Sequence, residues 1–168
     1  MFVVGIDPGL RRCGYAVLEV HGRKATARAL GVLTTPSSLG TPKRLGLLQA
    51  DLDGLLCEFP PAVVAVERLF FQVNTRTAIG VAQASGLAMA AGARAGAAVV
   101  EYTPNEVKQA VAGWGAASKP QMQRMVQSLL GLDDPPSPAD AADAAAVALC
   151  HLAHLPFRNR VAASVGER

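Results

Sequence analysis

Two short apolar segments, each ending in an acidic residue, constrain this chain more than any other feature. Residues 3–9 (VVGIDPG) reach Asp7 just before a Pro-Gly turn, and residues 62–67 (AVVAVE) end at Glu67. Val-rich runs of this kind favour strands that are buried on both faces, as in a parallel pairing. Two such strands place both carboxylates at one sheet edge, where open α/β sheets bind ligands. A desolvated carboxylate there needs a compensating cation, either a basic side chain or a metal ion.

The other segments complete an α/β pattern. Strands over 15–20 and 25–34, joined by the turn at 21–23, follow the first strand and predict an antiparallel meander. Leucines at three- and four-residue spacing predict a core-facing helix over 42–57, with Thr41 as its N-cap. We then expect a helix over 75–95, a strand over 98–102, a helix capped by Thr103, another that starts near 118, and a last helix over 139–155. This order predicts a mixed five-stranded sheet with helices on both faces.

Length and composition bound the class of protein. The chain has 168 residues, of which 51% are hydrophobic and 17% charged, enough for one domain with a sizeable core. We expect no signal peptide, and the Ala- and Gly-rich residues 81–100, which include Arg94, favour a buried helix over a membrane span. Three widely spaced cysteines predict reduced thiols and a cytoplasmic location. The net charge of +3 supports nucleic-acid binding only weakly.

Asp140 and Asp143, near the start of the last helix, add two carboxylates to the first pair. Acids in a first helical turn can merely complement the helix dipole, which is the simpler interpretation of either residue alone. Their spacing of three residues, however, puts both on one helix face, among alanines that let another group approach closely. Four acids at one point repel one another without cations, and oxygen-only ligands suit Mg²⁺ or Mn²⁺. Two such ions would suit an in-line phosphodiester displacement.

Four segments share their order and spacing with one known family. They are GIDPG at 5–9, VERLFF at 66–71, VKQAVAG at 107–113 followed by Lys119, and ADAADA at 139–144. Together they resemble the RuvC family of Holliday-junction resolvases over about residues 1–155. The resemblance implies an RNase H-like fold, a homodimer, two divalent ions per site, and paired symmetric cuts that leave 5′-phosphate and 3′-hydroxyl ends. It also implies a role in recombination and repair, with RuvA/RuvB-type branch-migration proteins as partners.

The resemblance also implies roles for individual residues. The family's catalytic, metal-binding acids match four positions of this chain: Asp7, Glu67, Asp140 and Asp143. Lys108 and Lys119 match basic residues that contact the cut region. Phe70 matches an aromatic residue near the junction centre, with Phe71 beside it, and Arg76 is a candidate phosphate contact.

Taken without the resemblance, these residues leave alternatives open. Lys108 and Lys119 could be solvated charges near helix ends. Phe70 and Phe71 could point into the core, although an exposed aromatic ring also makes a stacking platform for unstacked bases.

Other features favour simpler readings. Cys150, His151 and His154 could suggest zinc, but they are one ligand short, and packing explains them better. A junction-binding protein without chemistry is one rival function, but four uncompensated acids would repel DNA. An actin-like ATPase is another, suggested only by the strand and turn at 5–9; the chain lacks a second Gly-rich phosphate loop. We expect one domain over 1–155, followed by a basic, flexible tail over 156–168.

Overall fold

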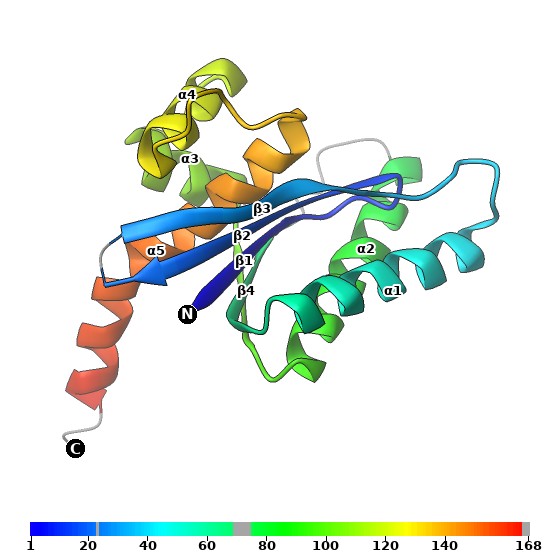
Figure 1. The fold of residues 1–168 in the computed structure, drawn as a ribbon, viewed down its shortest axis with the longest axis horizontal. Coiled ribbons are helices and arrows are strands. Elements are labelled where there is room, and N and C mark those ends of the chain that lie inside the picture. Colours follow the sequence, from blue (N-terminus) through cyan, green and yellow to red (C-terminus); the bar gives the residue numbers. More distant parts are fainter. Residues whose placement is uncertain (23, 69–74, 166–168) are drawn as a thin grey trace.

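The computed structural model describes residues 1–22, 24–68 and 75–165, and the side chains of all of these except 75–77 and 156–165. A five-stranded sheet in the order β3-β2-β1-β4-β5 forms its centre (Figure 1). The strands are β1 (Phe2–Asp7), β2 (Arg12–His21), β3 (Lys24–Thr34), β4 (Pro61–Glu67) and β5 (Ala98–Tyr102). The first three form the predicted antiparallel meander, β4 runs parallel to β1, and β5 runs parallel to β4. The sheet is therefore mixed, as the sequence predicts.

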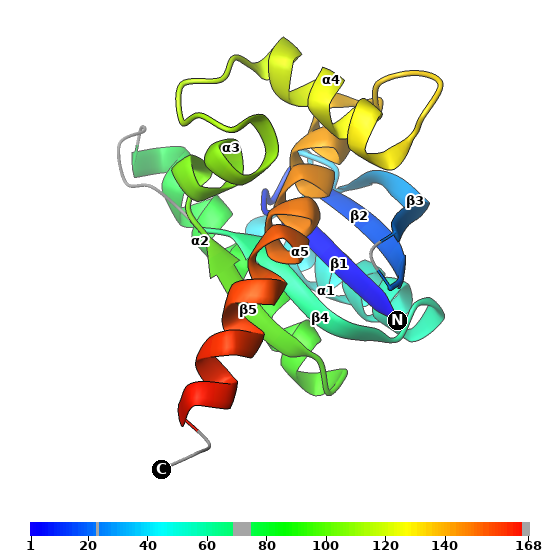
Figure 2. The same ribbon diagram turned by 90° about the vertical axis from the view of Figure 1, so that its left-hand side faces the viewer.

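Helices cover both faces of this sheet. They are α1 (Thr41–Glu58), α2 (Thr75–Arg94), α3 (Pro104–Ala112), α4 (Lys119–Leu130) and α5 (Ala139–Val165). Helices α1 and α2 pack together on one face, while α5 crosses the other face and carries α3 and α4 against it (Figures 1 and 2). The site at the sheet edge can thus receive side chains from β1, β4 and three helices.

Two hydrophobic clusters fill the space between these layers. Val4 and Ile6 of β1 face the α1–α2 layer and pack in one cluster with Leu48 and Leu52 of the predicted leucine stripe. Val3 belongs to the cluster on the opposite face, with the alanines of α5. Strand β1 is consequently buried on both faces, which explains its uninterrupted apolar sequence.

Glycines in β1 and β2 let α5 lie directly on the sheet. A Cβ atom added at Gly5 would lie 2.1 Å from the carbonyl oxygen of Ala144, and one at Gly14 would lie 2.2 Å from that of Asp140. No larger residue fits at either position without moving the helix. The alanine-rich face of α5, expected to leave room for another group, instead serves this close packing and fixes the start of α5 over the sheet.

Three predicted boundaries differ from the structure. Strand β2 begins at Arg12 rather than at residue 15. Thr41 is the first residue of α1 and not its cap; Gly40 is the N-cap and forms no side-chain cap bond. The last helix continues past Pro156 to Val165 and does not end at 155. Its last turns project beyond the sheet in Figures 1 and 2.

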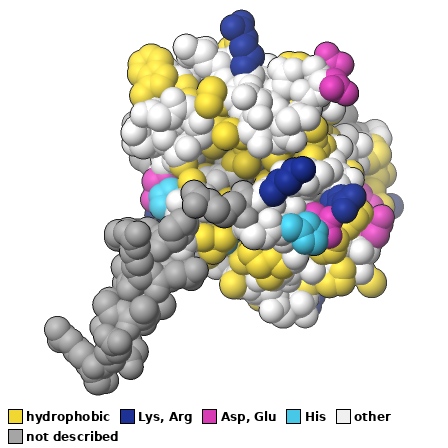
Figure 3. Space-filling model, turned by 60° about the vertical axis from the view of Figure 1, so that its left-hand side comes forward, with side chains coloured by type: hydrophobic (Ala, Val, Ile, Leu, Met, Phe, Trp, Pro, Cys, Tyr) yellow, Lys and Arg dark blue, Asp and Glu magenta, His cyan; other side chains and the backbone are white. Residues whose placement is uncertain are grey.

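The surface and the remaining motifs agree with the simpler interpretations. No helix among the described residues has the length and hydropathy needed to cross a bilayer. Nδ1 of His151 lies 3.0 Å from the Tyr102 hydroxyl, and Nδ1 of His154 lies 2.8 Å from the Cys150 carbonyl oxygen, so these residues take part in local packing. On the face shown in Figure 3, described basic side chains are scattered among acidic and apolar ones.

Candidate active site

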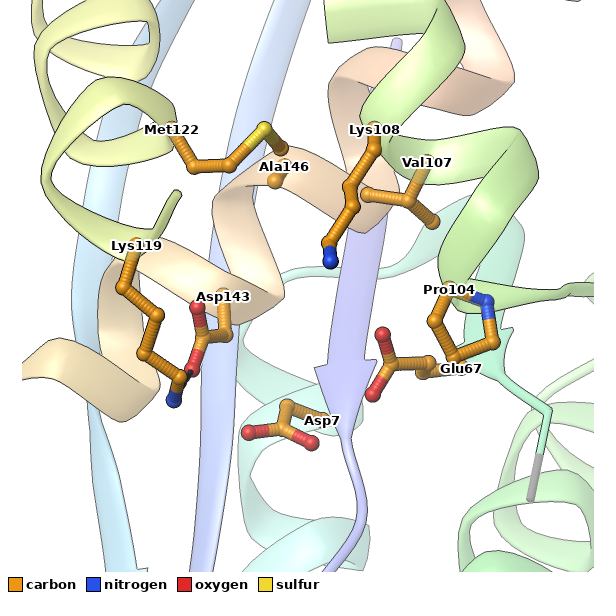
Figure 4. Close-up of a pocket in the computed structure, with 9 residues that line it drawn as sticks. All are labelled: Asp7, Glu67, Pro104, Val107, Lys108, Lys119, Met122, Asp143 and Ala146. Carbon is orange, nitrogen blue, oxygen red and sulfur yellow. Dashed lines mark hydrogen bonds and ion pairs between the residues drawn. The ribbon is translucent and has the colours of Figure 1, made fainter. Parts of the chain in front are cut away.

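The carboxyl ends of β1 and β4 meet at one edge of the sheet. In the parallel register Gly5 pairs with Ala65 and Ile6 with Val66, so the next residues along, Asp7 and Glu67, lie side by side. Both carboxylates point into one cavity of about 280 Å³ (Figure 4). The cavity is lined by Asp7, Glu67, Pro104, Val107, Lys108, Lys119, Met122, Asp143 and Ala146.

Helix α5 brings a third acid to this cavity, and α3 and α4 each bring a lysine. Asp143 accepts a hydrogen bond at 3.0 Å from the Lys119 ammonium group. The Lys108 side chain extends from α3 toward the space between the acids in Figure 4. Five of the six residues that the sequence suggests as catalytic therefore line a single cavity.

Capping interactions fix the two short helices that carry these lysines. Thr103 accepts a hydrogen bond from the Glu106 backbone N–H, and the Glu106 side chain accepts one from the Thr103 N–H at 2.7 Å. This is the cap predicted for α3. At the start of α4 the Gln121 side chain accepts the Ser118 N–H at 2.8 Å. These reciprocal capping interactions give hydrogen-bond partners to backbone N–H groups that would otherwise lack them. They fix the starts of α3 and α4 and thereby the backbone positions of the two lysines.

The electrostatics of the cavity oppose negative charge. Burial, followed by the charges of Glu67, Asp143 and Asp140, raises the pKa of Asp7 to about 7. Burial and the charge of Asp143 also raise the pKa of Glu67, although the Lys119 charge acts in the opposite direction. A positive charge in this cavity would stabilise the ionised form of both carboxyl groups.

The fourth predicted acid, Asp140, lies one turn before Asp143 on α5 but does not line the cavity. Its Oδ2 atom accepts hydrogen bonds from Arg12 Nη2 at 2.8 Å and from Arg12 Nε at 3.1 Å. The Arg12 guanidinium thereby lowers the pKa of Asp140 below its usual range. No local sequence pattern predicts a role for Arg12, because 128 residues separate it from Asp140.

The donor chemistry of the site suits a hard divalent cation. The acids supply only carboxylate oxygens, the ligands that Mg²⁺ and Mn²⁺ prefer. Among the residues that the structure describes, however, no three His, Cys, Asp or Glu side chains already form a metal cage.

Of the five predicted DNA contacts, Lys108 and Lys119 line the cavity, and the other three have side chains outside the part of the chain that the structure describes. Phe70 and Phe71 fall outside the described residues. Arg76 lies in the first turn of α2, and its side chain is likewise outside them.

Comparisons with known proteins identify a family that shares these features. The model of the family described as "Crossover junction endodeoxyribonuclease RuvC" matches residues 3–151. The enzyme of that name from Salinispora arenicola is 54% identical over 141 residues, which are 83% of this chain and 81% of that protein. The one from Streptomyces avermitilis is 49% identical over 166 residues, which are 98% of this chain and 94% of that protein.

A solved structure shares the fold. Thermus thermophilus RuvC in complex with a Holliday junction substrate matches with a TM-score of 0.87 and 37% sequence identity, over 94% of this chain and 96% of that chain. The predicted fold class, an RNase H-like mixed sheet of five strands, is confirmed by this match and by the sheet order.

Proposed function

This chain belongs to the RuvC family of crossover junction endodeoxyribonucleases, and from that membership we propose how it works on DNA. It is an endonuclease of recombination and repair that resolves four-way (Holliday) junctions by hydrolysing phosphodiester bonds. One observation supports the chemistry most directly. Three carboxylates from β1, β4 and α5 and two lysines from α3 and α4 converge on a single cavity. A protein that only binds DNA has no need of an acidic cavity that would repel the backbone.

We infer that divalent metal ions, Mg²⁺ or Mn²⁺ and two per site, complete this cavity. Asp7, Glu67, Asp140 and Asp143 would hold them, because their side chains supply only oxygen donors, and because burial, and then the neighbouring acids, raise the pKa of Asp7, which a bound cation would offset. When bound, the ions would activate a water molecule and stabilise the leaving oxygen. Glu67, beside Asp7 at the end of β4, would orient that water for in-line attack on phosphorus. Hydrolysis in this sense leaves a 5′-phosphate and a 3′-hydroxyl.

Lys108 and Lys119 would neutralise charge that develops at the cut phosphate. Both side chains line the same cavity as the acids; Lys108 is partly exposed and Lys119 is exposed. Donors fixed in advance at such a point stabilise a transition state without reorganising during the reaction. Lys119 holds Asp143 at 3.0 Å and would therefore also set the position of one metal ligand.

The remaining parts of the proposal concern recognition and assembly. Two symmetric cuts require two active sites, which a homodimer would provide. Phe70 and Phe71 are proposed to stack on unpaired bases at the junction centre, and Arg76 to contact a phosphate. RuvA/RuvB-type branch-migration proteins would act as partners, in the cytoplasm. These assignments rest on the family membership and lie beyond the described side chains.

A cleavage assay tests the proposal. A labelled four-way junction and a linear duplex of the same sequence are incubated with Mg²⁺, Mn²⁺ or EDTA. We expect paired cuts in the junction alone, abolished by EDTA, and an Asp7→Asn protein that binds the junction without cutting it. Equal cutting of duplex and junction would refute junction selectivity. Retained cutting by Asp7→Asn would refute the assignment of the site, and tight binding without cutting under any metal would favour a junction-binding protein without chemistry.

A further inference from the structure

A second cavity begins two residues beyond Asp7, at Gly9. Its volume is about 580 Å³, and its walls come from the turn after β1, the start of α1 and residues 79–83 of α2. Three arginines line it, Arg11, Arg12 and Arg44, and none of its lining residues is acidic. A cavity of this composition attracts anions.

Two of these arginines keep their charge available. Arg11 forms no ion pair with any residue that the structure describes. Arg44 donates Nε to the Thr35 hydroxyl at 2.9 Å, a neutral partner that orients the guanidinium without cancelling its charge. Helix α1 starts at this cavity without an acid in its first turn, and its dipole adds to the positive potential.

The third arginine connects the cavity to the candidate active site. Arg12 lines the arginine cavity and also holds Asp140, using both Nε and Nη2. These are donors of the planar fork with which arginine binds a phosphate group bidentately. A phosphate in the cavity and the Asp140 carboxylate therefore compete for the same edge of the Arg12 guanidinium. With 45% of the Arg12 side chain exposed, solvent and DNA can reach it.

We propose that the arginine cavity binds a backbone phosphate of the junction, and that Arg12 exchanges Asp140 for this phosphate. The exchange frees the Asp140 carboxylate to join Asp7, Glu67 and Asp143 around the metal. The inference rests on the proposed function, because it takes Asp140 as a metal ligand. By thermodynamic linkage, junction DNA then raises the affinity of the site for metal, and metal raises the affinity for the junction by the same factor.

The first test measures metal binding without DNA, so it does not depend on cleavage. Free Mn²⁺ is followed by electron paramagnetic resonance as protein is added. Arg12→Gln should bind Mn²⁺ about two- to five-fold more tightly than the wild type, the range expected when a solvent-exposed ion pair no longer competes for Asp140. Arg11→Gln is the matched control, since it removes the same charge from the same cavity without touching Asp140, and should leave Mn²⁺ affinity unchanged.

A third variant separates the lost charge from the lost contact. Arg12→Lys keeps the positive charge but replaces the planar fork by a single ammonium group. If Arg12 restrains Asp140 through bidentate bonds, this variant should gain part of the increase in Mn²⁺ affinity. Circular dichroism should show that all three variants are folded, because the substituted side chains are exposed.

The second test measures DNA binding, with Ca²⁺ in place of Mg²⁺ to keep the junction uncut. Each phosphate contact contributes about 0.9 to the slope of log affinity against log salt concentration. Arg11→Gln and Arg12→Gln should each lower that slope by about one. Adding Ca²⁺ should strengthen junction binding by the wild type more than binding by Arg12→Gln.

The outcomes separate this inference from the proposed function. An Arg12→Gln protein that binds Mn²⁺ no better than the wild type overturns the exchange. Unchanged salt slopes in both glutamine variants overturn the phosphate site. If the wild type cuts junctions while either result is found, the inference fails alone. A wild type that binds no Mn²⁺ and cuts no DNA instead overturns the proposed function.

Discussion

Replacing Asp7 by Asn should stabilise the metal-free protein, even though it should abolish cleavage. Burial, and then the charges of Glu67 and Asp143, raise the pKa of Asp7 from its ordinary value of 3.8 to about 7. Between these two pH values the folded protein keeps a proton that the unfolded chain has lost. Raising the pH across this interval therefore lowers the free energy of unfolding of the wild type. Because Asn carries no charge, the free energy of unfolding of Asp7→Asn should not fall in this way as the pH rises.

The pKa shift sets the size of the effect. About three pKa units correspond to about 4 kcal/mol once the pH exceeds about 7. The Asp7 side chain is only partly shielded from solvent, and Asn retains only part of its polar contacts. We therefore expect Asp7→Asn to add about 2 kcal/mol to the free energy of unfolding at about pH 8. The difference should shrink as the pH falls toward about 4 and vanish below about pH 3, where the carboxyl group is neutral in both states.

Urea unfolding in EDTA, followed by circular dichroism from about pH 4 to about pH 8, measures this difference. Asp51→Asn is the control: Asp51 is exposed on α1, so its substitution should cause no comparable pH-dependent gain. Adding Mg²⁺ should then favour the wild type, because a ligand that binds only the folded state stabilises it and the Asn variant lacks one carboxylate. Equal stabilities throughout the pH range, or a variant less stable at about pH 8, would refute the view that folding raises the pKa of Asp7.

Three further predictions concern the scaffold and the lysines. Gly5→Ala should lower the free energy of unfolding by about 3 kcal/mol, since its Cβ would lie 2.1 Å from a carbonyl oxygen of α5. The control is Gly46→Ala, whose added Cβ has no atom within 4 Å and which should leave stability unchanged or raise it; urea unfolding midpoints compare the two variants. Lys119→Ala should lower the single-turnover cleavage rate about 100-fold while junction affinity changes much less; an equal loss in both would contradict a role in the transition state. Thr103→Ala should cost about 1 kcal/mol and speed amide hydrogen exchange in α3 around Lys108; unchanged exchange would show that the cap does not fix that helix.

The sequence predicted the first half of the site because local rules decide it. Val-rich strands with parallel pairing end at the same sheet edge, so Asp7 and Glu67 had to be neighbours once both strands were central. Likewise, a spacing of three residues puts Asp140 and Asp143 on one face of α5 whatever surrounds them. These statements need only periodicity and the direction of the chain, and the structure agrees with them.

Tertiary contacts decided what the sequence did not predict. The Arg12–Asp140 pair joins the start of β2 to the start of α5, and no local pattern encodes it. Met125 and Leu129 of α4 are apolar but exposed, because the buried residues of this helix are Met122, Val126 and Leu130, at four-residue spacing. A stripe of apolar residues shows which side of a helix is buried only after its partners are known.

In the metal-free site, three of the four acids are held by a proton or a cation. Lys119 pairs with Asp143, Arg12 pairs with Asp140, and Asp7 keeps its proton up to about pH 7. If these acids bind the metal as proposed, metal binding displaces each of these partners, so affinity for the ion should be lower than four free carboxylates would give, and should rise with pH toward about 7. The phosphates of the DNA compete for the same arginine, and Lys119 would leave Asp143 when it contacts the cut phosphate. DNA binding would thus release the acids from their basic partners, and metal binding would release the basic side chains for DNA. All four acids would be available to the metal only when a junction is bound.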